Sequence, residues 1–166
     1  MSQASSLFTH LEFRLAKQLC HARWLPRSPR TQRFAMHLFQ RCAEAGHTSA
    51  LSRYGHMLFQ RAVNPQDKAR GAQYVLQAAH SGERCAQYQA GRIYEHGCTQ
   101  YPSRNDHAVT WYARAGEAGH PLAARRLAQA YREGVLGLPV DLNKAAYWQH
   151  LADQNAMLEP GDGMTR

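Results

Sequence analysis

The sequence repeats a pattern of large and small residues with a period of about 36 residues. The first half of each copy reads Leu15-Ala16-x-x-Leu19-x-x-Ala22, Tyr54-Gly55-x-x-Leu58-x-x-Arg61, Ala90-Gly91-x-x-Tyr94-x-x-Gly97 and Leu127-Ala128-x-x-Tyr131-x-x-Gly134. A second pattern of small and bulky residues follows, in the order Ala35-Leu38-Cys42-Ala43, Gly71-Tyr74-Ala78-Ala79, Ala108-Trp111-Ala115-Gly116 and Ala145-Trp148-Ala152. A repeat of this length is typical of stacked solenoids, which usually bind other molecules rather than catalyse.

Both halves of the repeat have the periodicity of a helix, because the apolar and small residues fall at i, i+1, i+4 and i+7. We therefore expect first (A) helices over residues 4–24, 48–61, 84–97 and 121–134, and second (B) helices over residues 31–45, 67–80, 104–118 and 141–155. The repeat units span about residues 7–46, 47–82, 83–119 and 120–156. Small residues such as Gly55 and Gly91 are expected where two helices cross closely.

Turn residues stand where this period predicts them. Gly46, Gly82 and Gly119 close three units, and we expect each to adopt the left-handed conformation that ends a helix. Asp67 and Asp141 are predicted N-caps, and Pro121 suits the first turn of its helix. The first unit has a longer connection, Trp24–Arg30, which is basic and contains two prolines.

Length and composition are those of one folded domain over residues 1–160, with residues 161–166 as a flexible tail. The formal net charge is +8, and the first 41 residues carry seven Lys or Arg against Glu12 alone. No apolar run approaches the ~18 residues of a membrane span. A secretory leader is not recognisable, so we expect a cytosolic protein.

The chemistry-bearing residues do not form a recognisable catalytic or metal motif. Four cysteines do not recur at equivalent repeat positions, and no C-x-x-C or His-x-His spacing indicates a metal site. Ten histidines are dispersed over turns and helices without a nucleophile–base pattern, the nearest pairs being Cys20-His21 and His96 with Cys98. We expect no catalytic residue, no metal, no cofactor and no enzymatic activity.

The third and fourth units resemble Sel1-like repeats, which are relatives of the tetratricopeptide repeat. Leu127-Ala128-Gln129-Ala130-Tyr131-Arg132-Glu133-Gly134, followed by Asp141, Ala145 and Trp148, is similar to the L-G-x-x-Y-x-x-G…D…A-x-x-W order of that family. Residues 108–119 are similar to its A-x-x-W-Y-x-x-A-A-x-x-G segment. The second unit departs at Leu58 and Arg61, and the first is recognisable by Leu15-Ala16 and Leu19.

This resemblance, over residues 11–156, implies an all-α, right-handed α/α solenoid of four helix pairs that acts as an adaptor or scaffold between macromolecules. Some secreted members carry a disulfide in every repeat. The present sequence lacks the cysteine pairs of that branch, which argues against the hydrolase activity claimed for it.

In such solenoids the A-helices line a concave groove. The predicted partner-binding residues are Lys17, His21, Ser52, His56, Phe59, Tyr88, Arg92, His96, Arg125, Gln129 and Arg132. The set is basic, with interleaved aromatic residues and histidines. Since arginine grips carboxylates with two parallel hydrogen bonds, we expect the groove to bind an acidic or carboxylate-bearing segment of a partner protein.

Three alternatives remain open, one of which is a regulatory subunit that modulates an enzyme. Arg23, Arg27, Arg30 and Arg33 form a basic cluster that could contact phosphates, which suggests a solenoid that binds nucleic acid or an anionic membrane surface through residues 23–33. The last helix pair, with Tyr147 and Trp148, is a candidate homodimer interface, unless Arg126 and Lys144 only mask its apolar surface.

Overall fold

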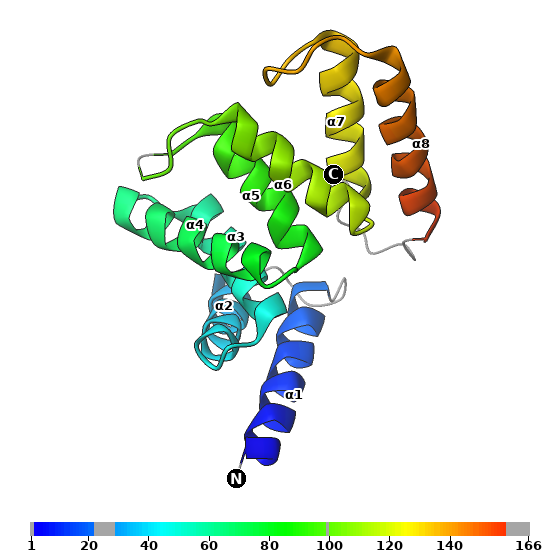
Figure 1. Cartoon of the computed structure of the whole chain (residues 1–166). Helices are drawn as coiled ribbons and strands as arrows, with labels where there is room; N and C mark the ends of the chain where they lie inside the picture. The colour runs from blue at the N-terminus through cyan, green and yellow to red at the C-terminus, as the bar shows by residue number, and fades with distance from the viewer. Residues whose placement is uncertain (1, 22–28, 99, 159–166) are drawn as a thin grey trace. The chain divides into compact units, whose positions relative to one another are not determined.

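The computed structural model describes the backbone of residues 2–21, 29–98 and 100–158, and in its first two helices the side chains of residues 8–18 and those from residue 30 onward. These residues form eight α-helices and no strand (Figure 1). The helices are α1 (Ser2–His21), α2 (Pro29–Glu44), α3 (Thr48–Arg61), α4 (Pro65–His80), α5 (Arg84–His96), α6 (Asn105–Glu117), α7 (Pro121–Glu133) and α8 (Leu142–Leu158). The all-α fold of four helix pairs is therefore confirmed.

The helix boundaries agree closely with the repeat pattern. The A-helices are α1, α3, α5 and α7, and the B-helices are α2, α4, α6 and α8. The second A-helix ends at Arg61, as predicted. The predicted end of the first A-helix at residue 24, most of the Trp24–Arg30 connection and the tail after residue 158 lie outside the described residues.

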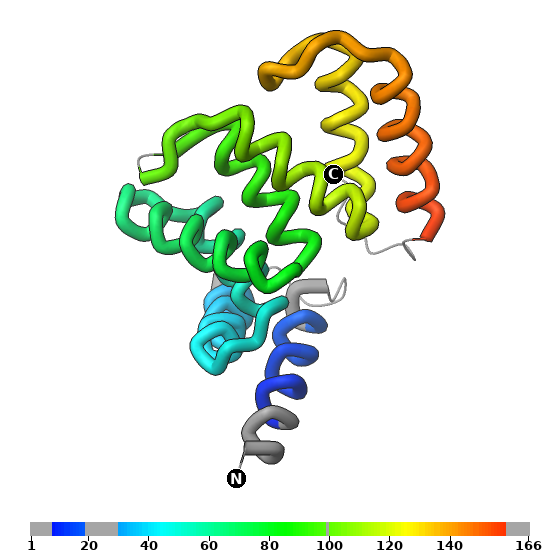
Figure 2. Tube along the Cα trace, viewed as in Figure 1, coloured from blue at the N-terminus to red at the C-terminus, as the bar shows by residue number. Residues whose placement is uncertain are grey.

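The chain divides into two compact units, Met1–Glu83 and Arg84–Arg166. In the first unit α2 lies between α1 and α3, and α3 packs against α4. In the second unit α5 packs against α6, and α7 lies between α6 and α8. Figure 2 shows α7 and α8 as two neighbouring antiparallel passes of the chain. Each unit thus holds two complete helix pairs.

Small residues allow the helices of a pair to cross at short range. A Cβ atom added to Gly55 of α3 would lie 2.8 Å from the Cβ of Tyr74 in α4. A Cβ added to Gly71 would lie 2.5 Å from the backbone nitrogen of Phe59. Because real Cβ atoms do not approach so closely, both positions require glycine at this spacing of the two helices.

The second unit has a core of small and aromatic side chains. Leu127 and Ala128 of α7 pack with Trp148 of α8 and with Tyr112 and Ala115 of α6. The buried alanines let the helices approach, and the rings fill the remaining space between them. This is the role that the repeat pattern predicted for its small and bulky positions.

The turns follow the prediction with one correction. Gly46, Gly82 and Gly119 have φ angles of +83°, +87° and +94°. Asp141 caps α8, since its Oδ1 accepts the backbone N–H of Lys144 at 3.0 Å. Asp67 is not an N-cap, because α4 begins earlier, at Pro65. Asn64 caps the helix instead, accepting the N–H of Asp67 at 2.7 Å while its own amide donates to the Asp67 carboxylate at 2.8 Å.

Two junctions between successive repeats contain an equivalent contact, in which a histidine ring stacks on an aromatic ring. His47, between α2 and α3, stacks on Phe13 of α1 with ring centroids 4.3 Å apart. His120, between α6 and α7, stacks on Tyr88 of α5 at 4.4 Å. The two histidines each follow a unit-closing glycine, and Phe13 and Tyr88 each precede the large–small pair of their helix by two residues. The repeat thus reproduces a specific contact as well as a helix pattern.

We predict that Gly71→Ala lowers the free energy of unfolding by about 3 kcal/mol, because the new methyl group meets backbone atoms of α3 that cannot move independently. Chemical denaturation followed by circular dichroism measures the change. Gln73→Ala, at an exposed position of the same helix, is the matched control and should alter stability by less than about 0.5 kcal/mol. Equal stability of the two variants would contradict the close crossing.

Candidate functional site

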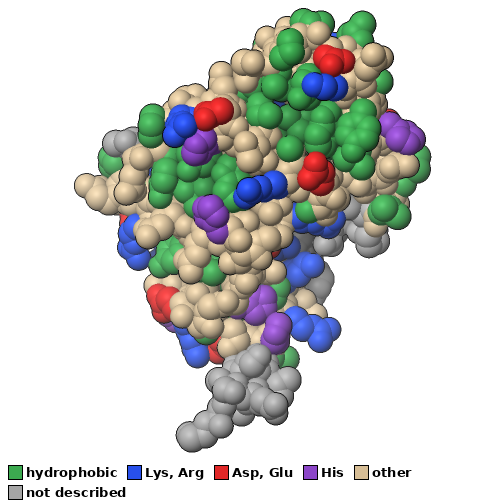
Figure 3. All heavy atoms as spheres, in the orientation of Figure 1, with side chains coloured by type: hydrophobic (Ala, Val, Ile, Leu, Met, Phe, Trp, Pro, Cys, Tyr) green, Lys and Arg blue, Asp and Glu red, His purple; other side chains and the backbone are tan. Residues whose placement is uncertain are grey.

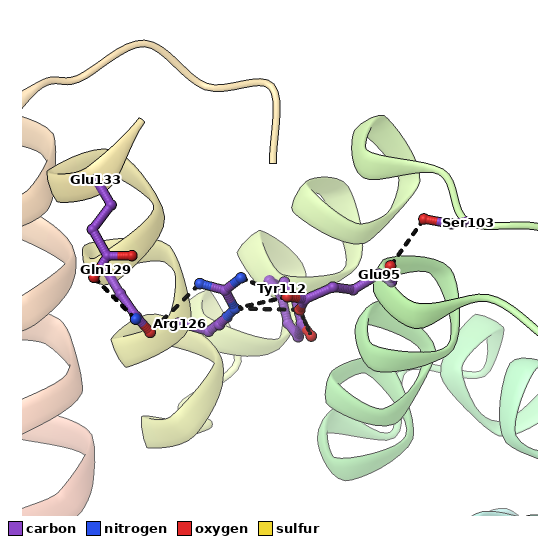
Figure 4. A network of polar contacts seen from close by, with 6 residues as sticks. All are labelled: Glu95, Ser103, Tyr112, Arg126, Gln129 and Glu133. Atoms are coloured by element: carbon purple, nitrogen blue, oxygen red, sulfur yellow. Dashed lines mark hydrogen bonds and ion pairs between the residues drawn. The ribbon is translucent and has the colours of Figure 1, made fainter. Parts of the chain in front are cut away.

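The carboxylate of Glu95, in the last turn of α5, accepts hydrogen bonds from two side chains at once (Figure 4). Only 13% of its side chain is exposed. Burying a carboxylate to this degree is unfavourable unless hydrogen bonds and an opposite charge compensate. Both are present, and they come from two other helices.

Arg126 of α7 supplies the opposite charge. Its Nε lies 3.1 Å from Oε1 and 3.2 Å from Oε2 of Glu95, and a terminal nitrogen of the same guanidinium also donates to Oε1. The two residues are 31 positions apart in the sequence and belong to the A-helices of the third and fourth repeats. This ion pair therefore links α5 directly to α7.

Tyr112 of α6 is the third member, and its hydroxyl donates to Oε2 of Glu95 at 2.6 Å. Its position depends on a glycine, since a Cβ on Gly91 of α5 would lie 2.6 Å from two atoms of the Tyr112 ring. The small residue that the repeat pattern places in α5 thus lets the tyrosine lie against that helix and reach the carboxylate. One acidic side chain is held by both of the helices that follow it.

The surroundings keep this group of side chains in one protonation state. Burial acts to raise the pKa of Glu95, but the hydrogen bonds from Arg126 and Tyr112 and the arginine charge outweigh it, and the pKa is lowered. The hydrogen bond to Glu95 is the main cause of the raised pKa of Arg126. Burial, followed by the bond to Glu95, raises the pKa of Tyr112. Glu95 is thus a structural anion with occupied oxygens, poorly suited to act as a general base.

The network continues along the surface of α7. A second terminal nitrogen of Arg126 donates to the side-chain oxygen of Gln129 at 3.5 Å, and the Gln129 amide donates to Glu133 at 3.1 Å. Gln129 is one of the predicted groove residues, and it remains exposed. It therefore connects the buried pair to solvent-facing groups.

Three arginines on α5 and α7 are not used by this network. Arg125 and Arg132 are exposed on α7, seven residues apart and hence on one face, and Arg92 of α5 is half-buried three residues before Glu95. No described residue forms an ion pair or hydrogen bond with their side chains. These three, which we call the arginine triad, are all predicted groove residues.

The remaining predicted residues of the second unit differ in availability. Tyr88 is half-buried and committed to the stack with His120. His96 is exposed at the end of α5, beside Glu95. The charge of His96 helps to lower the pKa of Glu95. In Figure 3 the Lys and Arg side chains on the visible face of this unit lie separately among hydrophobic ones.

The structure places the predicted residues of the first unit less uniformly. Lys17, His56 and Phe59 are half-buried, and the ammonium of Lys68 lies 5.1 Å from the centre of the Phe59 ring. Ser52 is only 5% exposed, so its side chain is not a contact surface. The side chain of His21 lies outside the described residues.

The predicted basic cluster is only partly described. Arg30 and Arg33 are exposed in the first turns of α2, whereas Arg23 and Arg27 lie outside the described residues. The described side chains include no group of three or more His, Cys, Asp or Glu that could hold a metal ion. Among the described cysteines, Cys42 is buried, Cys85 is exposed and Cys98 is half-buried, and none of them forms a disulfide.

Sequence reasoning missed Arg126 and Tyr112. Arg126 was expected to mask apolar surface on the last helix pair, but it faces α5 and pairs with Glu95. Tyr112 was not singled out, although it is the residue after the repeat's bulky Trp111. The available signal was the separation of Glu95 and Arg126 in the sequence. It is close to one repeat period and therefore places the two residues on neighbouring A-helices.

Comparison with known proteins agrees with this architecture. The profile of the Sel1 repeat matches residues 12–47, 48–83, 86–120 and 121–152, which is most of the chain. The chain belongs to the Sel1 repeat family. It is an α/α solenoid of four Sel1 repeats, and the third and fourth of them supply the Glu95 network and the arginine triad.

Solved structures show the same fold. A Sel1 repeat protein from Oxalobacter formigenes is 23% identical with a TM-score of 0.74, over 87% of this chain and 56% of that one. The protective antigen c5321 of uropathogenic Escherichia coli is 21% identical with a TM-score of 0.74, over 92% and 33%. The immunity protein Pa5087 of Pseudomonas aeruginosa is 17% identical with a TM-score of 0.57, over 89% and 68%.

The chain thus spans about half and one third of the length of the first two relatives. No curated protein matches its sequence. None of the described helices is long and apolar enough to cross a membrane.

We predict that Glu95→Gln lowers the free energy of unfolding by about 2 kcal/mol at pH 7, because Arg126 loses its charged acceptor. The pKa of Glu95 in the folded chain lies below its usual 4.5, so its contribution is complete above that value and is lost as the pH falls through the lowered pKa. Urea denaturation of wild type and Glu95→Gln should therefore show a smaller difference in the free energy of unfolding at pH 3 than at pH 7. An unchanged difference at pH 3 would mean that the carboxylate charge is not what stabilises the wild type.

Proposed function

We propose that this Sel1 repeat protein is a non-enzymatic adaptor that binds an acidic or carboxylate-bearing segment of a partner protein, and that the arginine triad of the second unit is its principal contact. Proteins of this family generally act as interaction scaffolds, which supports the first part of the proposal. The second part rests on Arg92, Arg125 and Arg132 themselves.

The observation that carries the proposal is that these guanidinium groups have no described intramolecular partner, although Glu95 follows Arg92 by three residues and Glu133 is next to Arg132. Glu95 is occupied by Arg126 and Tyr112, and Glu133 accepts from Gln129. The local acids are therefore already engaged, and the triad retains five donors on each guanidinium for an external acceptor.

The spacing of the triad suits an extended acidic segment. Seven residues of α-helix place Arg125 and Arg132 about 10.5 Å apart along α7. A polyproline II segment repeats every three residues, or about 9.3 Å, so acids at every third position would follow the arginines along the helix. Bidentate pairing of each guanidinium with a carboxylate would supply both affinity and register.

The rigid base of the triad supports this role. Glu95 and Arg126 fix α5 relative to α7, so Arg92 and the two arginines of α7 project from helices that do not move independently. A preorganised surface loses less entropy on binding than a mobile one.

The other hypotheses remain predictions. Binding of nucleic acid or an anionic membrane through residues 23–33 is supported by the exposed Arg30 and Arg33. A homodimer through the last helix pair is supported by the exposed ring of Tyr147, although Trp148 is buried within the unit. The single-domain organisation and a cytosolic location also stay predictions.

We predict that Arg92→Glu/Arg125→Glu weakens binding of a fluorescein-labelled (Glu-Pro-Pro)₄ peptide at least tenfold, measured by fluorescence anisotropy at 50 mM NaCl. The peptide presents a carboxylate at every third position of a polyproline II helix, and (Gln-Pro-Pro)₄ is its uncharged counterpart. Binding of wild type to the acidic peptide should weaken as NaCl is raised to 300 mM.

The charge-matched control is Arg70→Glu/Lys144→Glu, which reverses two exposed cations on the B-helices α4 and α8. This variant should bind within twofold of wild type. Equal loss in both variants would show that net charge, rather than the triad, attracts the peptide. Retained binding in the Arg92/Arg125 variant, with loss in Arg30→Glu/Arg33→Glu, would favour the basic cluster.

A further inference from the structure

The first helix carries an uncovered apolar stripe. Phe8, Leu11 and Leu15 follow one another at helical spacing along α1 and are 68%, 65% and 45% exposed. They lie on a different side of α1 from Thr9, Phe13 and Ala16, which face the rest of the unit. We call Phe8, Leu11 and Leu15 the α1 stripe.

The equivalent positions in later repeats are buried. Counted from the large–small pair of each A-helix, Leu11 and Leu15 correspond to Ala50 and Tyr54 of α3, which are 0% and 5% exposed. In α7 they correspond to Ala123 and Leu127, at 0% and 1%. Both α3 and α7 have a B-helix packed on either side, whereas α1 packs only against α2 among the described helices. The counterparts of the stripe residues are therefore buried in A-helices that have a B-helix on either side.

We propose that the α1 stripe is a docking surface for an amphipathic helix of a partner protein, bound in the way that α2 lies against α3 and α6 against α7. The surface lies in the first unit and is independent of the arginine triad. Its occupant is a helix with small residues on the contacting face and acidic residues along its flank.

The small-residue face follows from the junctions inside the chain. At Gly116 of α6 an added Cβ would lie 3.3 Å from the backbone nitrogen of Ala124 in α7. Ala43 of α2 is 4% exposed where that helix lies between α1 and α3. The junction of α6 with α7 thus brings a small residue of a B-helix to the A-helix that follows. Leu11 projects further than Ala50 and Ala123 at the equivalent positions, so the small residues of a docking helix would fit beside it.

The acidic flank follows from charge. Arg14 is exposed beside the stripe and has no partner among the described residues. Glu12, the one acid in the sequence of α1, is already held by Arg41 of α2 at 3.0 Å. An acidic side chain on the docking helix would supply the carboxylate that the protein itself does not offer to Arg14.

A second copy of this chain fits the stripe poorly. Of its B-helices, α2 and α6 already lie against an A-helix of the following repeat. The outer face of α8 has Gln149 and Asp153 at the positions of Tyr112 and Gly116, with the Gln149 amide donating to Asp153 at 3.0 Å. Docking that face on α1 would bury an acidic side chain against leucines. If the α1 stripes of two copies packed against each other, the Arg14 side chains of the two copies, which carry like charges, would lie near one another.

The stripe is presented by an anchored helix. Phe13 contacts Phe39 of α2 edge to face, with ring centroids 5.8 Å apart, and Glu12 pairs with Arg41. The thiol of Cys42 donates to the carbonyl of Thr9 at 3.5 Å. The Phe13 contact lies on the side of α1 away from the stripe, and none of the three contacts uses a stripe side chain, so substitutions in the stripe leave them in place.

The test uses a designed helix of known sequence. The probe is a hydrocarbon-stapled, fluorescein-labelled peptide with the sequence of residues 105–118 and the change Arg114→Glu, which combines the small-residue face of α6 with an acidic flank. The staple is needed because an isolated helix of about 14 residues is marginally stable in water. Anisotropy titrations with the full chain measure its affinity.

We expect Leu11→Glu/Leu15→Glu to weaken peptide binding at least tenfold and Arg14→Glu to weaken it about fivefold. The Arg14→Glu loss should shrink to less than twofold for the peptide that keeps Arg114. The matched control Gln73→Glu/Gln77→Glu adds the same charge at exposed positions of α4 and should bind like wild type. Circular dichroism melts check that every variant remains folded.

Several results would overturn the proposal. The first is an absence of saturable peptide binding to wild type, and the second is equal peptide binding by wild type and the Leu11→Glu/Leu15→Glu variant. Sedimentation of wild type as a dimer that the same variant dissociates would identify a second copy as the occupant. Binding of wild type, but not of this variant, to phosphatidylcholine–phosphatidylglycerol vesicles would identify a membrane surface instead. Loss of peptide binding in the Arg92/Arg125 variant would show that the two surfaces are not independent.

Discussion

The close crossing of paired helices is the constraint on which the rest of the structure depends. At Gly55, Gly71 and Gly91 an added Cβ would lie closer to the neighbouring helix than real side-chain atoms come. These positions fix the distance between helices, and that distance decides which larger side chains can reach one another. Tyr112 contacts Glu95 only because Gly91 lets its ring lie against α5. A packing rule of the repeat thus becomes the geometry of a polar site.

The two surfaces proposed for binding have different physical origins. The arginine triad is a charged surface whose local acids are already engaged, so it retains hydrogen-bonding capacity toward a carboxylate. The α1 stripe is an apolar surface that is exposed, whereas its counterparts in α3 and α7 are buried. Binding at the first should depend on salt, and binding at the second on buried apolar area. A scaffold with both could hold two partners of different chemistry at once.

The sequence was sufficient for the helices and their turns, because those follow from the spacing of small and bulky residues and from glycines after the B-helices. It was less informative about contacts between repeats. Asp67 has the residue type of an N-cap, yet Asn64 takes that role because Pro65 starts the helix one turn earlier. Ser52 is in register with the exposed Arg125 of the fourth repeat but is buried. Arg126 could not be paired with Glu95 from the pattern of either helix alone, since their contact requires two crossings to be placed first.

The pair of Glu95 and Arg126 also has a consequence for the history of the array. Repeat proteins grow and shrink when whole repeats are duplicated or deleted, and most junctions tolerate this because their contacts recur in every unit. The contact between Glu95 and Arg126 does not recur, because the glutamate belongs to the third repeat and its arginine to the fourth. Inserting a unit between them would leave a carboxylate and a guanidinium each without its counter-ion. The third and fourth repeats should therefore be inherited as one block, while recombination acts elsewhere along the chain.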